Sequence, residues 1–498
     1  MSKITLEELQ NYLWDAAVLL RTHIDAGSYK QYIFPLLFFK RLCDVYDEEY
    51  ERAFQLSGGD AEYASFEENH SFTIPTGAHW NDIRSKSSDI GQAIVDAFRK
   101  IEKSNIEKLQ GVFGDGTWTN KNRLPDTLLK DLIEHFSTKK LSIENCPEDE
   151  MGVAYEYLIK KFADDSGHTA QEFYTNRTVV HLMTEMLEPQ SGETIYDPTC
   201  GSAGMLISSI AYLKDKGEEW RNVGLYGQEI NSLTSAIGKM NLFLHGVPDF
   251  SIVNGDTLSS PAFIKNGKLQ RFDMVLANPP YSIKQWNRDA FANDRYGRNF
   301  LGTPPQGRAD YAFFQHILKS MDQETGRCAI LFPHGVLFRQ EEAEMRKKLV
   351  HFDLVECVIG IAPNLFYNSS MDACIVVCRS QKPVERRGKI LFIDASKEVS
   401  HEGTFTYLSG EHIQKIAEVY KTGAIIESFS AIATIQDIAE NKYSLNLPLY
   451  VRQPGKKVKL ETLSLQEQCD SWVESSEEVW KAFSDVLTVY REGVDDNE

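Results

Sequence analysis

Two consecutive prolines that directly follow a short apolar run constrain this chain more than any other feature of its sequence. The run 274–277 has the length and composition of a strand buried on both faces of a parallel sheet. Pro279 and Pro280 have no N–H to offer a β-ladder and force extended backbone before them, so the strand must end at Asn278. Because open α/β sheets bind their ligands at the carboxyl ends of strands, segment 273–281 predicts a rigid elbow at the functional edge of such a sheet.

The predicted elbow would present a carboxamide from Asn278, a fixed backbone carbonyl from Pro279 and the aromatic ring of Tyr281. An exocyclic amino group is a poor nucleophile because its lone pair is delocalised into the ring. Two oxygens that accept its N–H bonds would free that lone pair, and an aromatic ring can stack on a base taken out of its helix. We therefore take Asn278, Pro279, Pro280 and Tyr281 as catalytic candidates for amino-group methylation. The alternative is a strand-ending turn with a surface tyrosine.

Three further predicted strands precede the elbow, and each ends in an acidic residue. They are 194–197, ending at Asp197; 224–229, ending at Glu229; and 251–256, ending at Asp256. A glycine-bearing loop, Gly201-Ser202-Ala203-Gly204, follows the first strand and lacks the lysine of a phosphate loop. An acid before this loop suits a ligand with an ammonium group, the second suits ribose hydroxyls, and the third suits an adenine amino group. One such acid is usually just solvated, but three in succession favour a ligand.

A polar segment before the first strand leads into a predicted helix over 179–187. It reads Glu172-Phe173-Tyr174-Thr175-Asn176-Arg177. We expect Thr175 to cap this helix, where free backbone N–H groups could meet a carboxylate. Taken by itself, this segment is better explained as a capped helix with no ligand.

The remaining chain predicts three regions: 1–146, a helical N-terminal domain; 147–452, the catalytic domain; and 453–498, a linker with an amphipathic helix. Residues 282–307 form a long polar loop after the elbow, which is typical of a functional segment. The tail has an a/d seam that could dock on a partner's helices or fold back on its own domain. Its members are Leu465, Cys469, Trp472, Ser476, Val479, Phe483, Val486 and Tyr490.

Composition limits the classes of function. No apolar run is long enough to span a membrane, there is no signal-peptide core, and eight cysteines without a CxxC pair favour reduced thiols, so we expect a cytoplasmic protein with no metal centre. The net charge of −19 argues against a large DNA-binding surface on this chain, because duplex affinity is mostly phosphate neutralisation. Either the substrate is not DNA, or a partner supplies much of the positive surface.

The order of these elements resembles an amino-methyltransferase of the gamma arrangement, in which the cofactor motifs precede N-P-P-Y. In detail the chain resembles the modification subunit of type I restriction–modification systems, and the similarity covers nearly all of it. The family's D-P-x-x-G-x-x-G is matched at every fixed position by 197–204. Its F-T-P-R appears as 174–177, with Asn176 in place of the proline. The resemblance implies an α/β fold: a Rossmann-like class I S-adenosylmethionine-dependent methyltransferase core with a helical N-terminal domain and a helical tail.

The resemblance also implies S-adenosylmethionine across the ends of the first three strands, and direct transfer of its methyl group to adenine N6 in double-stranded DNA. The implied cofactor-binding residues are Glu172, Phe173, Tyr174, Thr175, Asn176, Arg177, Asp197, Gly201, Ser202, Ala203, Gly204, Glu229 and Asp256. From the residues themselves, Tyr281 would contact the flipped adenine, and Phe366 could do so too, although packing against the sheet edge explains Phe366 at least as well. In that family a specificity subunit reads the DNA, two modification subunits flank it, and a restriction subunit can join. Two alternatives stay open: a stand-alone amino-methyltransferase acting on RNA or on protein glutamine, and a non-catalytic assembly subunit.

Overall fold

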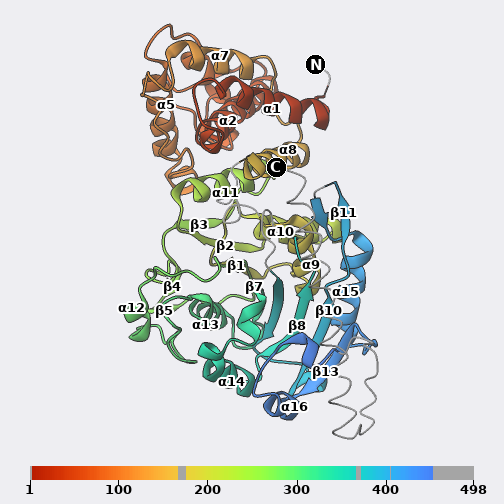
Figure 1. The fold of residues 1–498 in the computed structure, drawn as a ribbon. Coiled ribbons are helices and arrows are strands. Elements are labelled where there is room, and N and C mark those ends of the chain that lie inside the picture. The colour runs from red at the N-terminus through yellow and green to blue at the C-terminus, as the bar shows by residue number, and fades with distance from the viewer. Residues whose placement is uncertain (1–2, 166–174, 366–371, 404, 452–498) are drawn as a thin grey trace, which may run out of the picture. The chain divides into compact units, whose positions relative to one another are not determined.

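A mixed β-sheet carries the catalytic candidates. The computed structural model describes residues 3–165, 175–365, 372–403 and 405–451, and within these ranges nine strands form one sheet in the order β13-β10-β8-β9-β7-β6-β1-β2-β3 (Figure 1). The strands are β1 (Thr194–Asp197), β2 (Gly224–Glu229), β3 (Ser251–Asn254), β6 (Met274–Ala277), β7 (Arg327–Pro333), β8 (Val355–Ile361), β9 (Ala373–Arg379), β10 (Lys389–Ala395) and β13 (Ser430–Thr434).

The predicted strand before the elbow is confirmed as β6, which lies inside the sheet. It pairs in parallel with β1, with Ile195 opposite Met274, and with β7, with Ala277 opposite Ile330. All four residues of β6 are buried. From β1 the chain proceeds outward through β2 and β3, and it then returns to place β6 and β7 on the other side of β1. The order of strands therefore reverses between β1 and β6, and this is the place where such sheets form a ligand crevice.

Helices cover both faces of the sheet. Alternate residues of β6 point to opposite faces: Met274 and Leu276 pack with α9, α10 and α15, whereas Val275 and Ala277 pack with α13 and α14. The alternation explains why every residue of this strand is apolar. The bounds of these helices are α9 (Arg177–Leu187), α10 (Gly204–Lys216), α13 (Asp310–Ser320), α14 (Ala343–His351) and α15 (Gly410–Thr422).

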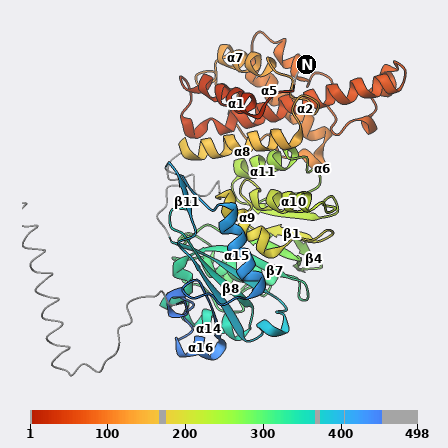
Figure 2. The ribbon, with the colours of Figure 1, turned by 90° about the vertical axis from the view of Figure 1, so that its right-hand side faces the viewer.

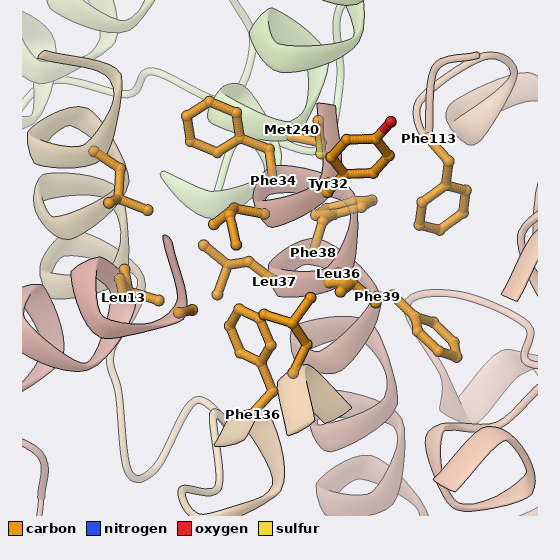
Figure 3. Close-up of a cluster of buried hydrophobic side chains, with 14 of the residues drawn as sticks. Leu13, Tyr32, Phe34, Leu36, Leu37, Phe38, Phe39, Phe113, Phe136 and Met240 are labelled. Carbon is orange, nitrogen blue, oxygen red and sulfur yellow. The ribbon is translucent and has the colours of Figure 1, made fainter. Parts of the chain in front are cut away.

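The N-terminal region is helical, as predicted, and it shares one apolar core with the catalytic region. Phe34, Phe38 and Phe39 of the long helix α2 lie in this core, and Met240 of α11 reaches it from the catalytic side (Figure 3). Helices α8 and α11 contact each other and lie between the N-terminal helices and the sheet (Figure 2). The helices concerned are α1 (Leu6–Leu20), α2 (Lys30–Leu56), α3 (Ala61–Ala64), α4 (Trp80–Arg84), α5 (Ile90–Ser104), α6 (Ile106–Leu109), α7 (Asp126–Ser137), α8 (Glu148–Asp165) and α11 (Ser232–Leu244).

Several elements were not predicted from the sequence. They are the hairpins β4 (Ile264–Lys265) with β5 (Lys268–Leu269) and β11 (Ser400–Glu402) with β12 (Phe405–Tyr407), the helices α12 (Arg288–Ala292), α15 and α16 (Ile435–Glu440), and the edge strand β13. Helix α12 lies within the expected loop 282–307. The predicted tail helix lies outside the described residues, and the domain boundaries at 146 and 452 stay predictions. In the part of the chain that is described, no helix has the length and apolarity needed to cross a bilayer.

Candidate active site

Four neighbouring strands bring the predicted site residues to one edge of the sheet. Asp197 ends β1, Glu229 ends β2, Asp256 follows β3 by two residues, and Asn278 follows β6 by one. These strands are adjacent and parallel in the order β6-β1-β2-β3, so their carboxyl ends meet at the same edge. The predicted juxtaposition of three acids and the elbow is therefore present in the fold.

The carboxamide of Asn278 is oriented by a residue from a distant part of the sequence. Its Nδ2 donates to Oγ1 of Thr175 at 2.9 Å. This bond fixes the amide plane and directs Oδ1 away from Thr175, and no described residue donates to that oxygen. Pro279 is buried while Asn278 is half-buried, so the elbow is rigid but its acceptor side is accessible. This hydrogen bond could not be predicted from the sequence, because it joins residues 103 positions apart.

The prediction that Thr175 caps α9 was wrong: Asn176 is the cap. Asn176 Oδ1 accepts from the backbone N–H of Thr178 at 3.0 Å and from its hydroxyl at 2.8 Å. Its Nδ2 donates to the carbonyls of Leu365 and Thr406, both at 3.0 Å, and the side chain is buried. Both the oxygen and the nitrogen of the Asn176 amide therefore form hydrogen bonds. The hydroxyl of Thr175 does not cap the helix, and it accepts from Asn278 instead.

Behind the elbow, Tyr281 has a buried hydroxyl and Ser282 is held by a buried ion pair. The Tyr281 hydroxyl is buried without a hydrogen-bond partner among the described residues, and burial raises its pKa well above the usual value. Ser282 has a φ of 50°, and its N–H donates to Asp310 at 2.9 Å. Asp310 is bound in turn by Arg339 at 2.7 Å. Asp310 thus fixes the backbone that follows the elbow, a role that the sequence did not indicate.

The glycine-bearing loop is held against the second acid. Gly201 has a φ of 52° and donates its N–H to Oε2 of Glu229 at 3.0 Å, while Ala203 has a φ of 63° and precedes the first residue of α10. Gly204 has no room for a side chain, because a Cβ there would lie 1.7 Å from Nη1 of Arg177. The two glycines therefore have different roles. Gly201 adopts a left-handed backbone conformation, and Gly204 allows the guanidinium of Arg177 to approach the backbone.

The two outer acids differ in environment. Burial, reinforced by the nearby Glu229 carboxylate, raises the pKa of Asp197 to about 8. Its Oδ1 accepts from the N–H of Thr199 at 3.0 Å. Asp256 is half-buried and accepts from the N–H of Leu258 at 3.0 Å. The charged form of Asp197 is therefore disfavoured by its surroundings, and a nearby cation would stabilise it.

Arg177 lies beside the glycine-bearing loop and is paired with a residue of α8. Its guanidinium donates to both oxygens of Glu156, at 2.6 and 2.9 Å, and to Oγ of Ser202 at 3.1 Å. Burial alone would raise the pKa of Glu156, but Arg177 holds it below its usual value. Asn241 of α11 donates to Glu156 and, at 2.8 Å, to the carbonyl of Ser202. Side chains of α8 and α11 thus support the loop from outside, which sequence reasoning missed.

A cavity of about 380 Å³ borders this cluster on the side of α8. Arg177 and Gly204 line it, but none of the three strand-end acids does, so it is separate from the sheet edge described above. Four predicted site residues, Glu172, Phe173, Tyr174 and Phe366, lie outside the described residues. In the part of the structure that is described, no group of three His, Cys, Asp or Glu side chains has the arrangement of a metal site.

The reversal of strand order, the strand-end acids and the N-P-P-Y elbow together define an amino-methyltransferase. Residues 147–458 match the family of N-6 DNA methylases, and residues 9–136 match the HsdM N-terminal domain. The chain belongs to the N-6 DNA methylases, as a methylase subunit of the type I restriction enzymes.

Individual relatives agree with this assignment. The chain is 31% identical to the type I restriction enzyme MjaVII methylase subunit of Methanocaldococcus jannaschii, over 99% of this chain and 85% of that protein. It is 32% identical to the HindI methylase subunit of Haemophilus influenzae, over 74% and 84%. The type I restriction–modification methyltransferase subunit from Streptococcus thermophilus has a similar structure, with a TM-score of 0.78 and 30% identity over 90% of this chain and all of that one.

Proposed function

We propose that this chain methylates N6 of adenine in DNA with Asn278 and Pro279 as the groups that hold the amino nitrogen. The observation that carries this assignment is the Asn278 carboxamide, whose nitrogen is engaged by Thr175 at 2.9 Å. With the nitrogen engaged, Oδ1 is the atom presented at the sheet edge, and it is a hydrogen-bond acceptor. An acceptor at this position suits a substrate N–H, whereas a donor would not.

The reaction then follows from the positions of the acceptors. Asn278 Oδ1 and the Pro279 carbonyl accept the two N–H bonds of the amino group and draw its lone pair out of the ring system. When S-adenosylmethionine is bound, it supplies an electrophilic methyl group. Asn278 Oδ1 and the Pro279 carbonyl would stabilise the positive charge that develops on N6 when it accepts the methyl group. One N–H proton then leaves to water, and no covalent bond to the enzyme is needed.

The residues at the ends of β1 to β3 suit that cofactor. Asp197, whose pKa is raised by burial and by the nearby Glu229 carboxylate, would hold the ammonium of the methionine part, and that cation would favour its charged form. Glu229 would accept from the ribose hydroxyls, and Asp256 from the adenine amino group. Ile230 follows Glu229 directly and is 68% exposed, so its side chain is available to pack against the adenine ring of a bound cofactor. Its exposure adds Ile230 to the residues that the sequence suggested.

Tyr281 would stack on the displaced adenine, because it follows the two prolines directly and is partly exposed beside Asn278. Phe366 is retained as a second contact, and Glu172 to Tyr174 as part of the methionine pocket. The relatives are subunits of type I restriction enzymes, so we extend to this chain an assembly with a specificity subunit that reads the DNA and a restriction subunit that can join. Two copies of the chain per specificity subunit complete this proposal.

The test compares Asn278→Ala with a matched exchange at the exposed Asn122, Asn122→Ala, by mapping 6-methyladenine across the genome of the source cell. We expect Asn278→Ala to abolish methylation at one split, two-part sequence and Asn122→Ala to preserve it. Loss at a short continuous palindrome would instead indicate an enzyme that reads its own site. An unchanged map in the Asn278→Ala strain would reject DNA as the substrate and favour RNA, protein glutamine or a purely structural subunit.

A further inference from the structure

The segment that follows the elbow folds back on itself. Gln306 Nε2 donates to the carbonyls of Lys284 and Trp286, both at 3.1 Å, and Trp286 Nε1 donates to the carbonyl of Gln306 at 2.9 Å. Residues 284–288 therefore lie against residues 304–308. This pairing brings three cations together, and we call Lys284, Arg288 and Arg308 the basic lobe.

The basic lobe has an excess of positive charge in a chain whose net charge is −19. The acids of segment 282–310 are Asp289, Asp294 and Asp310. Asp294 is occupied by Arg298 at 2.6 Å and Asp310 by Arg339 at 2.7 Å, and both carboxylates are buried. Among the described residues, no acid forms a salt bridge with any member of the lobe. Asp289 is the single exposed acid of this segment, and the buried Glu342 outside it interacts electrostatically with Arg308 without a salt bridge between them.

The lobe is held in place before any partner arrives. Arg298 and Asp294 are each 3% exposed in their side chains, and Arg298 also donates to the carbonyls of Thr257 and Leu258 at 3.0 and 2.8 Å. These carbonyls directly follow Asp256. Arg288 Nε donates to the carbonyl of Pro304 at 2.8 Å, which fixes the base of the lobe. A surface ordered in this way loses little conformational entropy on binding.

The lobe is also close to the elbow. Lys284 is three residues from Tyr281, so their Cα atoms are at most about 10 Å apart. A base that reaches Tyr281 remains attached to its own strand, with a phosphate on either side. An unpaired lysine or arginine at this distance can meet those phosphates, and phosphate neutralisation is the main source of nucleic-acid affinity.

We propose that Lys284, Arg288 and Arg308 bind the DNA phosphates that flank the displaced adenine. This inference rests on the proposed function and deepens it, because it identifies the part of an acidic chain that contacts the DNA backbone. An acidic surface of a partner protein would also suit three cations. The position beside Tyr281 favours DNA, because the substrate must occupy that place during transfer.

The experiment measures DNA binding by the chain copurified with its specificity partner, as a function of KCl concentration. Each lost phosphate contact makes the slope of log K against log salt shallower by about 0.9. We expect the double variant Lys284→Gln/Arg308→Gln to reduce the slope by about 1.8, and Lys284→Arg to retain it. The control is Lys216→Gln/Lys268→Gln, which removes two exposed charges outside segment 282–310, at the end of α10 and in the hairpin β4–β5, and leaves the slope at its native value.

A native slope in the Lys284→Gln/Arg308→Gln complex would overturn the inference. Loss of the specificity partner on purification, with no change of slope, would also overturn it and assign the lobe to a protein interface. Binding and methyl transfer separate the two proposals. If the native complex methylates DNA and the variant keeps the native slope, only the lobe fails. If the slope depends on the lobe but the native complex transfers no methyl group to DNA, the lobe stands and the catalytic assignment fails.

Discussion

Asn176 is the residue whose replacement tests the site architecture most directly. Its amide caps α9 through one atom and holds the carbonyls of Leu365 and Thr406 through the other. Loss of an N-cap costs about 1 kcal/mol. Each of the two buried carbonyls loses a hydrogen bond worth about 1 kcal/mol. We therefore expect Asn176→Ala to destabilise this part of the fold by about 3 kcal/mol.

Asn176→Asp separates the two roles. This exchange keeps the oxygen that caps α9. It replaces Nδ2, the donor to the carbonyls of Leu365 and Thr406, with a second buried oxygen that repels them. We expect it to be at least as destabilising as Asn176→Ala, although aspartate is a good cap elsewhere. Proline, the residue that the family has here, would fit the φ of −53° but offers no donor either.

Amide hydrogen exchange in α9 measures the effect locally, which suits a chain too large for a single unfolding equilibrium. A loss of about 3 kcal/mol lowers protection about 100-fold, at 1.4 kcal/mol per factor of ten. The control is Asn287→Asp in α12, where the oxygen caps Ala290 N–H and the amide is exposed, so protection should stay at the native level. If the amides of α9 were as well protected in Asn176→Asp as in the native chain, the hydrogen bonds from Asn176 to the carbonyls of Leu365 and Thr406 would not stabilise this helix.

Two further predictions concern buried charges. Because burial raises the pKa of Asp197 to about 8, its ionisation is disfavoured in the fold, and the stabilisation of the neutral form is lost as pH rises from about 4 through 8. Asp197→Asn should make the cofactor-free chain lose less thermal stability between pH 6 and 8, and parallel profiles for the two proteins would contradict this. Arg298→Met leaves Asp294 buried without a counterion and should lower the local stability around 294–298 by about 3 to 5 kcal/mol, measured as lost amide protection in hydrogen exchange. The double variant with Asp294→Leu should recover much of this loss, and a double variant no more stable than Arg298→Met would refute the ion-pair explanation.

The sequence predicted the parts of the site that depend on local pattern. The prolines and the apolar run were enough to place β6, and the strands before Asp197 and Glu229 have the predicted bounds. The resemblance supplied the family, which the comparisons confirmed. The roles of Thr175 and Asp310 could not be predicted, because each depends on a contact between segments far apart in the chain.

The net charge of the chain did not predict the basic lobe. A net charge is a sum over the whole surface, and it hides the arrangement of the ions that contribute to it. The cations of segment 282–310 became visible only when the structure showed that Asp294 and Asp310 are already paired. The edge strand β13 was not predicted, because its residues, Ser430 to Thr434, include only a short apolar run.

Helix α11 contacts both the N-terminal helices and the glycine-bearing loop of the catalytic region. Its Met240 packs with the N-terminal helices, while its Asn241 supports the loop at Ser202. A chimera that exchanged N-terminal regions between relatives would therefore have to carry the outer face of α11 with them, although that face lies about a hundred residues downstream of the exchanged segment. If the two regions were inherited separately, the packing beside the glycine-bearing loop would be mismatched. Recombination within this family should therefore favour breakpoints that leave α11 and its N-terminal partners together.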